Sequence, residues 1–228
     1  MEIGEIYKKI DAIGCLTFAT IENGYPETRI AHFFAYDKDG IYMRTMDVKP
    51  LYRQLKKTGR LSCCGMYPKT QVEHDEEGLP HFLPGYTLRV TGDVRELSME
   101  EIEEKAVLND AFYVATFDIK KYPETRVFVM YKAWGEIYDY DYEWQNRDHK
   151  LERERFAWGG AEYEEPGLSI TDACIKCGAC KSVCTFDAIK LKSDDSQYEI
   201  LGNRCDECGN CFNICPVHAV IDKGHYRR

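Results

Sequence analysis

The chain has 228 residues, which is enough for one large domain or two small ones, and 44% of them are hydrophobic, which is enough for a core. Its 39 acidic and 30 basic side chains give a formal net charge of −9, and the whole excess of acid lies before residue 170. Such a surface repels a phosphate backbone, so we expect no nucleic acid among its partners.

The first 84 residues show short apolar patterns separated by turn residues. Ile3, Ile6, Tyr7 and Ile10 follow the spacing of one helix face, and β-rich runs lie between turns that contain glycine. In chain order the predicted elements are a helix over 2–12, strands over 15–21, 28–36 and 41–44, a helix over 49–58, a strand over 60–66 and a loop over 67–84. The loop holds three of the eight prolines.

The next segment continues the β-rich pattern. Residues 86–97 alternate apolar and polar side chains, which predicts a strand, and Ser98 with Glu101 forms a capping box that opens a helix over 99–109. Two further strands are predicted, over 125–130 and 133–140. Short strands with turns between them are typical of a small antiparallel barrel, so the predicted fold class is mainly β with helices (α+β).

Charged residues are dense between positions 141 and 167, and this stretch ends in Pro166-Gly167. We interpret residues 141–167 as a charged, partly helical linker. It would join a barrel over residues 1–140 to a small cysteine-rich domain over residues 168–228.

The cellular compartment is suggested by two sequence features. No stretch approaches the roughly 18 apolar residues of a membrane span, and residues 1–14 contain no apolar core of signal-peptide length. We therefore expect a cytoplasmic protein without membrane contact. Eleven cysteines in that compartment favour metal or redox chemistry over a disulfide scaffold.

Eight of the 11 cysteines form two copies of one spacing, C-x-x-C-x-x-C-x-x-x-C, and each cysteine recurs 31 positions later. They are Cys174, Cys177, Cys180 and Cys184, then Cys205, Cys208, Cys211 and Cys215. This spacing is typical of cubane iron–sulfur clusters. Structural zinc is the alternative, but zinc usually uses two ligand pairs separated by a longer spacer. The remaining Cys15, Cys63 and Cys64 are expected to be buried thiols in strands.

Residues 170–223 closely resemble the two-cluster ferredoxins, in which each motif supplies the fourth ligand of the other motif's cluster. The resemblance implies two [4Fe-4S] clusters, one bound by Cys174, Cys177, Cys180 and Cys215 and the other by Cys205, Cys208, Cys211 and Cys184. One position departs from the family pattern. The proline after the last cysteine is present as Pro216 in the second motif, but Thr185 replaces it in the first.

Two segments of the predicted barrel carry residues that suit an anion. They are Arg29, Ile30, Ala31 and His32 on the second predicted strand, and Arg44, Thr45, Met46 and Lys49 where a strand runs into a helix. The start of that helix offers free N–H groups and a positive dipole end, so Arg29, Thr45 and Lys49 together suit a phosphate. Taken singly, such basic residues are more often solvated or salt-bridged, and a lone histidine is more often structural.

The same stretch is similar to a known family. A hairpin with Asn23-Gly24, strands with Arg29 and Arg44-Thr45, a Lys-Pro-Leu-Tyr-Arg-Gln-Leu helix and a Leu-Arg-Val-Thr-Gly strand follow the order of the pyridoxamine-phosphate-oxidase-like flavoproteins. The resemblance covers residues 1–140 and implies an FMN-binding split β-barrel that forms a homodimer, with FMN at the subunit interface.

This resemblance also implies roles for single residues. Residues 29–32 would line the isoalloxazine and the ribityl chain, and Thr45 and Lys49 would hold the phosphate. The spacing from Thr45 to Lys49 is shorter than in the vitamin-processing oxidases, and their substrate-phosphate residues have no counterpart here. We therefore do not expect this chain to oxidise vitamin B6.

Together these features predict a flavin and iron–sulfur oxidoreductase. It would pass electrons between two [4Fe-4S] clusters and FMN to reduce or oxidise a small organic substrate, with a ferredoxin or another redox protein as partner. One alternative is a non-catalytic electron-transfer or redox-sensing protein in which the barrel is a dimerisation module. Another is a flavin reductase that uses a nicotinamide cofactor. The sequence identifies no catalytic residue, substrate or direction of electron flow.

Overall fold

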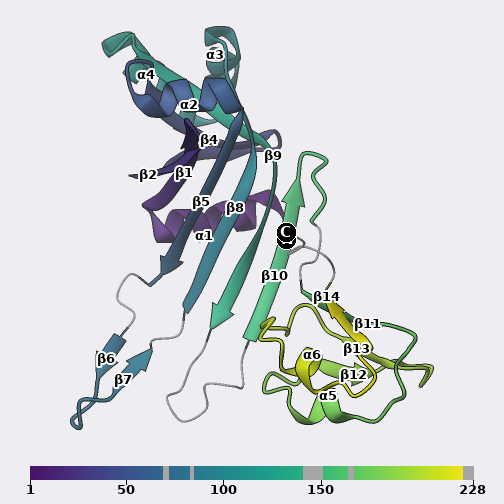
Figure 1. Cartoon of the computed structure of the whole chain (residues 1–228). Helices are drawn as coiled ribbons and strands as arrows, with labels where there is room; N and C mark the ends of the chain where they lie inside the picture. The colour runs from purple at the N-terminus through teal and green to yellow at the C-terminus, as the bar shows by residue number, and fades with distance from the viewer. Residues whose placement is uncertain (69–71, 83–84, 141–150, 164–166, 223–228) are drawn as a thin grey trace. The chain divides into compact units, whose positions relative to one another are not determined.

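The protein is described by a computed structural model that covers residues 1–68, 72–82, 85–140, 151–163 and 167–222 (Figure 1). The chain divides into two compact units. The first comprises residues 1–69, 87–136 and 155–163, and the second comprises residues 70–86, 137–154 and 164–228. Within the described ranges, the structure confirms the prediction of a mainly β fold with helices.

One sheet dominates the described part of the chain, with eight strands. In hydrogen-bonded order seven of them are β2 (Tyr25–Ala31), β1 (Leu16–Glu22), β5 (Arg60–Tyr67), β8 (Gly85–Glu96), β9 (Thr125–Tyr140), β4 (Gly40–Met46) and β3 (Phe33–Asp37). Strand β10 (Leu151–Trp158) lies off this path and pairs with β9. Four helices belong to the first unit, namely α1 (Ile3–Ile13), α2 (Pro50–Thr58), α3 (Met99–Leu108) and α4 (Asp110–Lys121).

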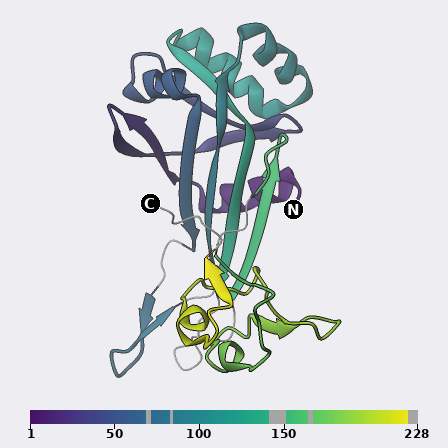
Figure 2. The same ribbon diagram turned by 45° about the vertical axis from the view of Figure 1, so that its right-hand side comes forward.

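The order of the strands requires this sheet to curl. Its two end strands, β2 and β3, are consecutive in the chain, and only His32 lies between them. One segment therefore runs from one edge of the sheet to the other, which brings the edges together as in the predicted barrel (Figures 1 and 2). Phe18 on β1 and Phe33 on β3 face the enclosed side, where their ring centroids lie 4.9 Å apart.

Helix α4 completes a second apolar layer on the other side of β3 and β4. Phe112 is fully buried, and its ring meets Tyr42 at 4.7 Å and Phe34 at 5.6 Å, in both cases edge to face. The helix begins at Asn109, whose side-chain oxygen accepts a hydrogen bond from the backbone N–H of Ala111.

The Phe112 contacts carry a stability prediction. Replacing Phe112 with alanine should lower the free energy of unfolding by about 3–5 kcal/mol, because the change leaves a cavity between two aromatic rings. Phe117→Ala on the same helix is the matched control, since Phe117 is 55% exposed, and it should change stability by about 0.5 kcal/mol or less. Urea unfolding followed by circular dichroism measures both, and equal losses would contradict this account of the core.

The bounds of several predicted elements differ from those in the structure. The strand predicted over residues 28–36 is two strands, β2 and β3, because the chain changes edge at His32. The two strands predicted over 125–140 are one, because β9 continues past Met130, where its pairing with β4 ends. The pattern predicts no element over residues 110–121, which form α4.

Two predicted irregular segments contain strands. The predicted loop over 67–84 holds the hairpin of β6 (Val72–His74) and β7 (Pro80–Phe82). In the linker predicted over 141–167, residues 151–158 form strand β10, while residues 141–150 and 164–166 lie outside the described residues. In both cases pairing with another strand decides the conformation, β7 for β6 and β9 for β10.

The three cysteines outside the repeats differ in exposure. Cys63 on β5 is buried as predicted, and burial raises the pKa of its thiol. Cys15 and Cys64 are exposed, which corrects the prediction. Cys64 follows Cys63 on a strand whose successive side chains point to opposite faces, so the two cannot share one environment.

The cysteine-rich part of the second unit is a small fold of short elements. Strand β11 (Leu168–Ile170) pairs with β14 (Val220–Asp222), β12 (Ile189–Leu191) pairs with β13 (Tyr198–Ile200), and the helices are α5 (Ala179–Ser182) and α6 (Asn210–Ile214). The pairing of β11 with β14 joins the two ends of this segment. One cluster of its buried residues consists of Cys180, Ile189, Cys211 and Val220, so thiols make up half of that cluster. No helix in the described ranges is long and apolar enough to cross a membrane.

Candidate functional site

Two pockets in the second unit are each lined by four cysteines. The first, with an empty volume of about 300 Å³, is lined by Cys174, Cys177, Cys180 and Cys215. The second, of about 340 Å³, is lined by Cys184, Cys205, Cys208 and Cys211. Each pocket therefore combines three thiols of one repeat with the last thiol of the other. These sets coincide with those that the ferredoxin resemblance implies, while their role as cluster ligands stays a prediction.

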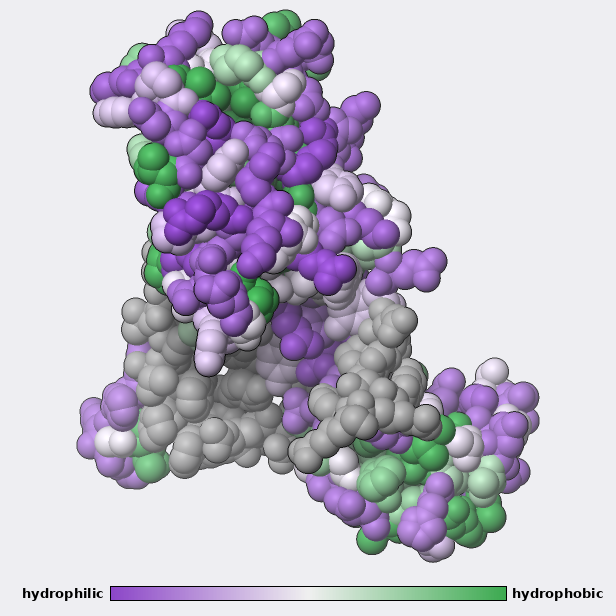
Figure 3. Space-filling model, turned by 45° about the horizontal axis from the view of Figure 1, so that its top comes forward, coloured by the Kyte–Doolittle hydropathy of each residue, from purple (hydrophilic) through white to green (hydrophobic). Residues whose placement is uncertain are grey.

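The other lining residues of both pockets are largely apolar. Ile175 and Val217 line the first pocket and are also exposed, at 59% and 37%. Figure 3 shows green, hydrophobic residues on the visible face of this region, at the lower right. Across the described residues, His, Cys, Asp and Glu side chains form no group of three or more that could hold a single metal ion, and the four thiols of each pocket surround an opening instead.

Backbone N–H groups point at four of the eight sulfur atoms, at the same positions in both repeats. The first cysteine accepts from the amide two residues later, at 3.4 Å for Lys176 to Cys174 and 3.3 Å for Glu207 to Cys205. The last cysteine accepts from the amide four residues later, as in Ala188 to Cys184 at 3.3 Å. The matching bond, from Ala219 to Cys215, is 3.2 Å. Such donors stabilise thiolate charge and tune a cluster's potential.

This arrangement depends on backbone conformations that also repeat. Lys176 and Glu207 have φ of 58° and 61°, in the left-handed region, which turns their amides back toward the sulfur. Gly178 and Gly209 have φ of 76° and 80° and cap the starts of α5 and α6. Glycine suits these two positions because it adopts positive φ without steric cost. The spacing alone identified the cysteines in the sequence. The positive-φ residues between them show how the backbone turns its amides toward the sulfur atoms.

The thiols of the two pockets differ in acidity. Burial raises the pKa of Cys180 and Cys205, and it raises the pKa of Cys211 to about 11. Burial also opposes ionisation of Cys215, but hydrogen bonds from backbone amides, among them that of Ala219, bring the pKa of its thiol below the usual value. Metal binding must therefore displace protons from the buried thiols.

In the first unit, Arg29 on β2 is positioned by a polar network. Its guanidinium donates to Thr20 Oγ1 at 2.7 Å, and the Thr20 hydroxyl donates to Gln54 Oε1 on α2 at 2.6 Å. Thr20 and Gln54 are buried, and Arg29 is half-buried without a salt bridge to any described residue. Burial lowers the pKa of Arg29, while the charge of Glu27 acts in the opposite direction. A partly desolvated cation of this kind suits an anionic ligand.

The junction of β4 and α2 holds Arg44, Thr45 and Lys49, but their environments differ. Arg44 forms a salt bridge with Asp118 on α4, and its guanidinium lies 5.0 Å from the centroid of the Phe34 ring. Thr45 is buried, and its Oγ1 has no hydrogen-bond partner in the described part of the chain. Lys49 is exposed and precedes Pro50, the first residue of α2.

The structure does not gather all the predicted flavin residues into one enclosed site. Ile30 is 68% exposed, and His32, at the bend between β2 and β3, is also exposed. Ala31 and Met46 are half-buried at the ends of their strands. The observations that fit a phosphate are therefore the positioned guanidinium of Arg29, the unpartnered hydroxyl of Thr45 and the start of α2 beside Lys49.

Sequence reasoning missed the residues that hold these groups in place. Thr20 and Gln54 position Arg29, and Asp118 pairs with Arg44. Gln54 lies 34 residues from Thr20 and Asp118 lies 74 residues from Arg44, so no spacing pattern connects them. Thr20 is closer to Arg29, on the neighbouring strand of one hairpin. The capping Asn109 before α4 was a local signal that could have placed Asp118 on a helix.

Comparisons with known proteins bear on each part of the chain. Residues 173–219 match the 4Fe-4S dicluster domain family, which confirms the predicted ferredoxin-like region. No curated protein matches the chain. Among solved structures, it is similar to a NimC/NimA family protein from Clostridium acetobutylicum, at 19% identity and a TM-score of 0.48, over 68% of this chain and 91% of that one.

Two further solved structures resemble the chain. One is a pyridoxamine 5'-phosphate oxidase-related, FMN-binding protein from Nostoc punctiforme, at 12% identity and a TM-score of 0.39, over 67% of this chain and 95% of that one. The other is the heme storage protein HutZ from Vibrio cholerae, at 14% identity and a TM-score of 0.40, over 57% of this chain and 90% of that one.

Proposed function

We propose that this protein is an oxidoreductase that holds two [4Fe-4S] clusters in its second unit and FMN in its first. The observation that carries the proposal is the pair of pockets, each lined by four thiols drawn from both repeats. Residues 173–219 match the dicluster family, which supports the same ligands. Four N–H groups that donate to sulfur fit thiolates better than neutral thiols.

The flavin part of the proposal is supported by residues that fit its phosphate. Arg29 is oriented by Thr20 and lacks an ion pair in the described ranges, and Thr45 has an unpartnered hydroxyl. A rotation about χ1 of Thr45 therefore breaks no hydrogen bond when the hydroxyl turns to a ligand. The resemblance of residues 1–140 to FMN-binding split barrels supports the same assignment, and implies a homodimer.

The chain's own residues would have separate tasks in this function. Clusters carry electrons singly, whereas a flavin exchanges one or two, so the pair suits reduction or oxidation of a small organic substrate. Arg29 and Lys49 would hold the phosphate, and the amides of Lys176 and Glu207 would stabilise the thiolates. A ferredoxin or another redox protein in the cytoplasm would be the external partner.

A second candidate function is electron transfer or redox sensing without catalysis, with the barrel as a dimerisation module. The exposure of Ile30 and His32 favours it, because an isoalloxazine bound there would need another surface to cover it. This candidate predicts bound clusters without a bound flavin.

Cofactor analysis of the anaerobically purified chain tests both candidates. We expect about eight irons and about eight sulfides per chain, a broad absorption band, and about one FMN released on denaturation. Iron and sulfide without flavin would support the electron carrier. Zinc in place of sulfide would overturn the cluster assignment, and heme in the extract, checked as its pyridine complex, would overturn the flavin assignment.

A further inference from the structure

The two cysteine pockets share a backbone but differ in charge. Lys176 and Glu207 occupy the same position of the two repeats, have φ of 58° and 61°, and donate their amides to the first cysteine at 3.4 and 3.3 Å. The backbone contribution at this position is therefore closely matched in the two repeats. The side chains differ, because one repeat has a cation at this position and the other has an anion.

Charges close to the cysteines in sequence give the two pockets opposite balances. The first pocket has two lysines and one aspartate within two residues of its cysteines, namely Lys176, Lys181 and Asp172. Over the same distance from its cysteines, the second has two carboxylates and one arginine, namely Asp206, Glu207 and Arg204. Asp206 and Glu207 line that pocket directly, and Arg204 lies 3.9 Å from Asp187.

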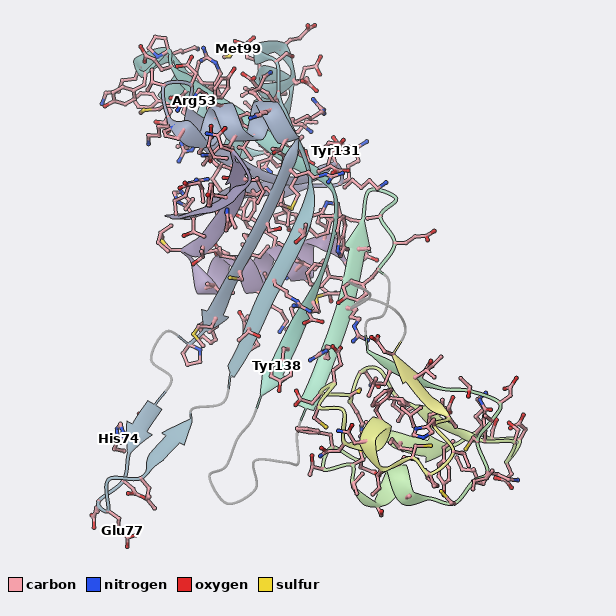
Figure 4. The ribbon with its side chains drawn as sticks, in the orientation of Figure 1. Arg53, His74, Glu77, Met99, Tyr131 and Tyr138 are labelled. Atoms are coloured by element: carbon pink, nitrogen blue, oxygen red, sulfur yellow. The ribbon has the colours of Figure 1, made fainter. Side chains whose placement is uncertain are left out.

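One more cation reaches the second pocket from outside the repeats. Arg153 on β10 donates to Glu207 Oε1 at 2.7 Å, and only 10% of its side chain is exposed. Its guanidinium lies 5.5 Å from the centroid of the Tyr138 ring, on the last part of β9 (Figure 4), and its backbone N–H donates to the Asn203 carbonyl at 2.9 Å. Arg153 is thus held beside Glu207 and offsets that carboxylate.

Reduction adds one negative charge to a cluster, so nearby cations favour the reduced form and nearby anions oppose it. We propose that the two clusters differ in reduction potential, that the cluster of Cys174, Cys177, Cys180 and Cys215 has the higher potential, and that Lys176, Glu207 and Arg153 set the difference. This inference rests on the proposed function, since it requires clusters in both pockets. A chain that holds a single electron then keeps it mainly on the first cluster.

Variants of the holoprotein in which one charged side chain is replaced by glutamine test the proposal, because each should shift a reduction potential in a stated direction. Glu207→Gln should raise the lower of two potentials because it removes an anion beside that pocket, and Arg153→Gln should lower the same potential because it removes the cation held next to Glu207. Lys176→Gln should lower the higher potential. Each change is expected to shift the distribution of a single electron between the clusters about tenfold, or about 59 mV for a one-electron couple.

The measurement is an anaerobic redox titration at low ionic strength, followed by electron paramagnetic resonance. Lys190→Gln is the matched control. It removes one cation from β12, where Lys190 lies opposite Glu199 in the strand pairing and further along the chain from any cysteine than Lys176, so smaller shifts are expected. A structural disturbance would move the potentials of Glu207→Gln and Arg153→Gln in the same direction, which would contradict the proposal.

Iron analysis separates failure of this inference from failure of the proposed function. Fewer than about eight irons per wild-type chain would overturn the proposed function and the inference together. A full iron content with two equal potentials would overturn the inference alone. The inference alone would also be overturned if the iron content were full and Lys176→Gln shifted the lower of the two potentials.

Discussion

Removing two cysteines of the first sequence repeat, Cys174 and Cys184, is expected to destroy both clusters, whereas removing Cys174 and Cys215 should destroy only one. The reason is that Cys174 and Cys215 line the same pocket, while Cys184 lines the other one. The chain with Cys174→Ala and Cys215→Ala should keep about four irons, and the chain with Cys174→Ala and Cys184→Ala should keep almost none.

The two double variants form a matched pair, because each removes two thiols from the same unit. Iron and sulfide content after anaerobic reconstitution is the measurement. Cys64→Ala serves as the control, since Cys64 is an exposed thiol of the first unit, and it should keep the full iron content. If each sequence repeat bound its own cluster, the order of the two double variants would be reversed.

Replacing Arg29 with methionine should weaken FMN binding about 10- to 150-fold, with little change in the stability of the apoprotein. A charge-assisted hydrogen bond to phosphate contributes about 1.5–3 kcal/mol, and the variant keeps an unbranched side chain without the charge. Stability should change by only about 0.5–1.5 kcal/mol, because Arg29 loses one hydrogen bond, to Thr20, and has no salt bridge to a described residue to lose. Riboflavin, which lacks the phosphate, should bind equally to the variant and the wild type.

Arg44→Met supplies the contrast, because the structure pairs Arg44 with Asp118. We expect this variant to lose stability, since it leaves a carboxylate on α4 uncompensated, and to keep its preference for FMN over riboflavin. Fluorescence titration with both flavins and urea unfolding of the apoproteins measure the two effects. If Arg44→Met abolished the preference and Arg29→Met did not, the phosphate assignment of Arg29 would be wrong.

The cysteine pockets were the part most open to prediction, because their ligands are chemical signals with a short, fixed spacing. The interval of 31 residues between the two repeats and the two glycines are visible in the sequence, whereas the positive φ of Lys176 and Glu207 is seen only in the structure. The proposed flavin site was harder to predict, since its evidence is single basic residues. Sequence could not tell that Arg44 would bind Asp118 while Arg29 stayed without an ion pair in the described ranges.

Local pattern failed where a distant partner decides conformation. Residues 151–158 are charged and read as a linker, yet they form β10 because β9 supplies hydrogen-bond partners. Residues 110–121 combine aromatic and β-branched residues that are weak helix formers, and burial of Phe112 against Tyr42 offsets that weakness in α4.

The sequence by itself determined the eight cysteines, their two repeats and the mainly β class, because ligand spacing and strand alternation are local properties of a chain. The resemblance to two-cluster ferredoxins already implied which thiols share a pocket, and the structure places the same sets together. Tertiary structure alone decided that Arg44 pairs with Asp118 and that Arg153 lies beside Glu207. These depend on contacts between residues far apart in the chain, and such contacts leave no mark in the spacing of either partner.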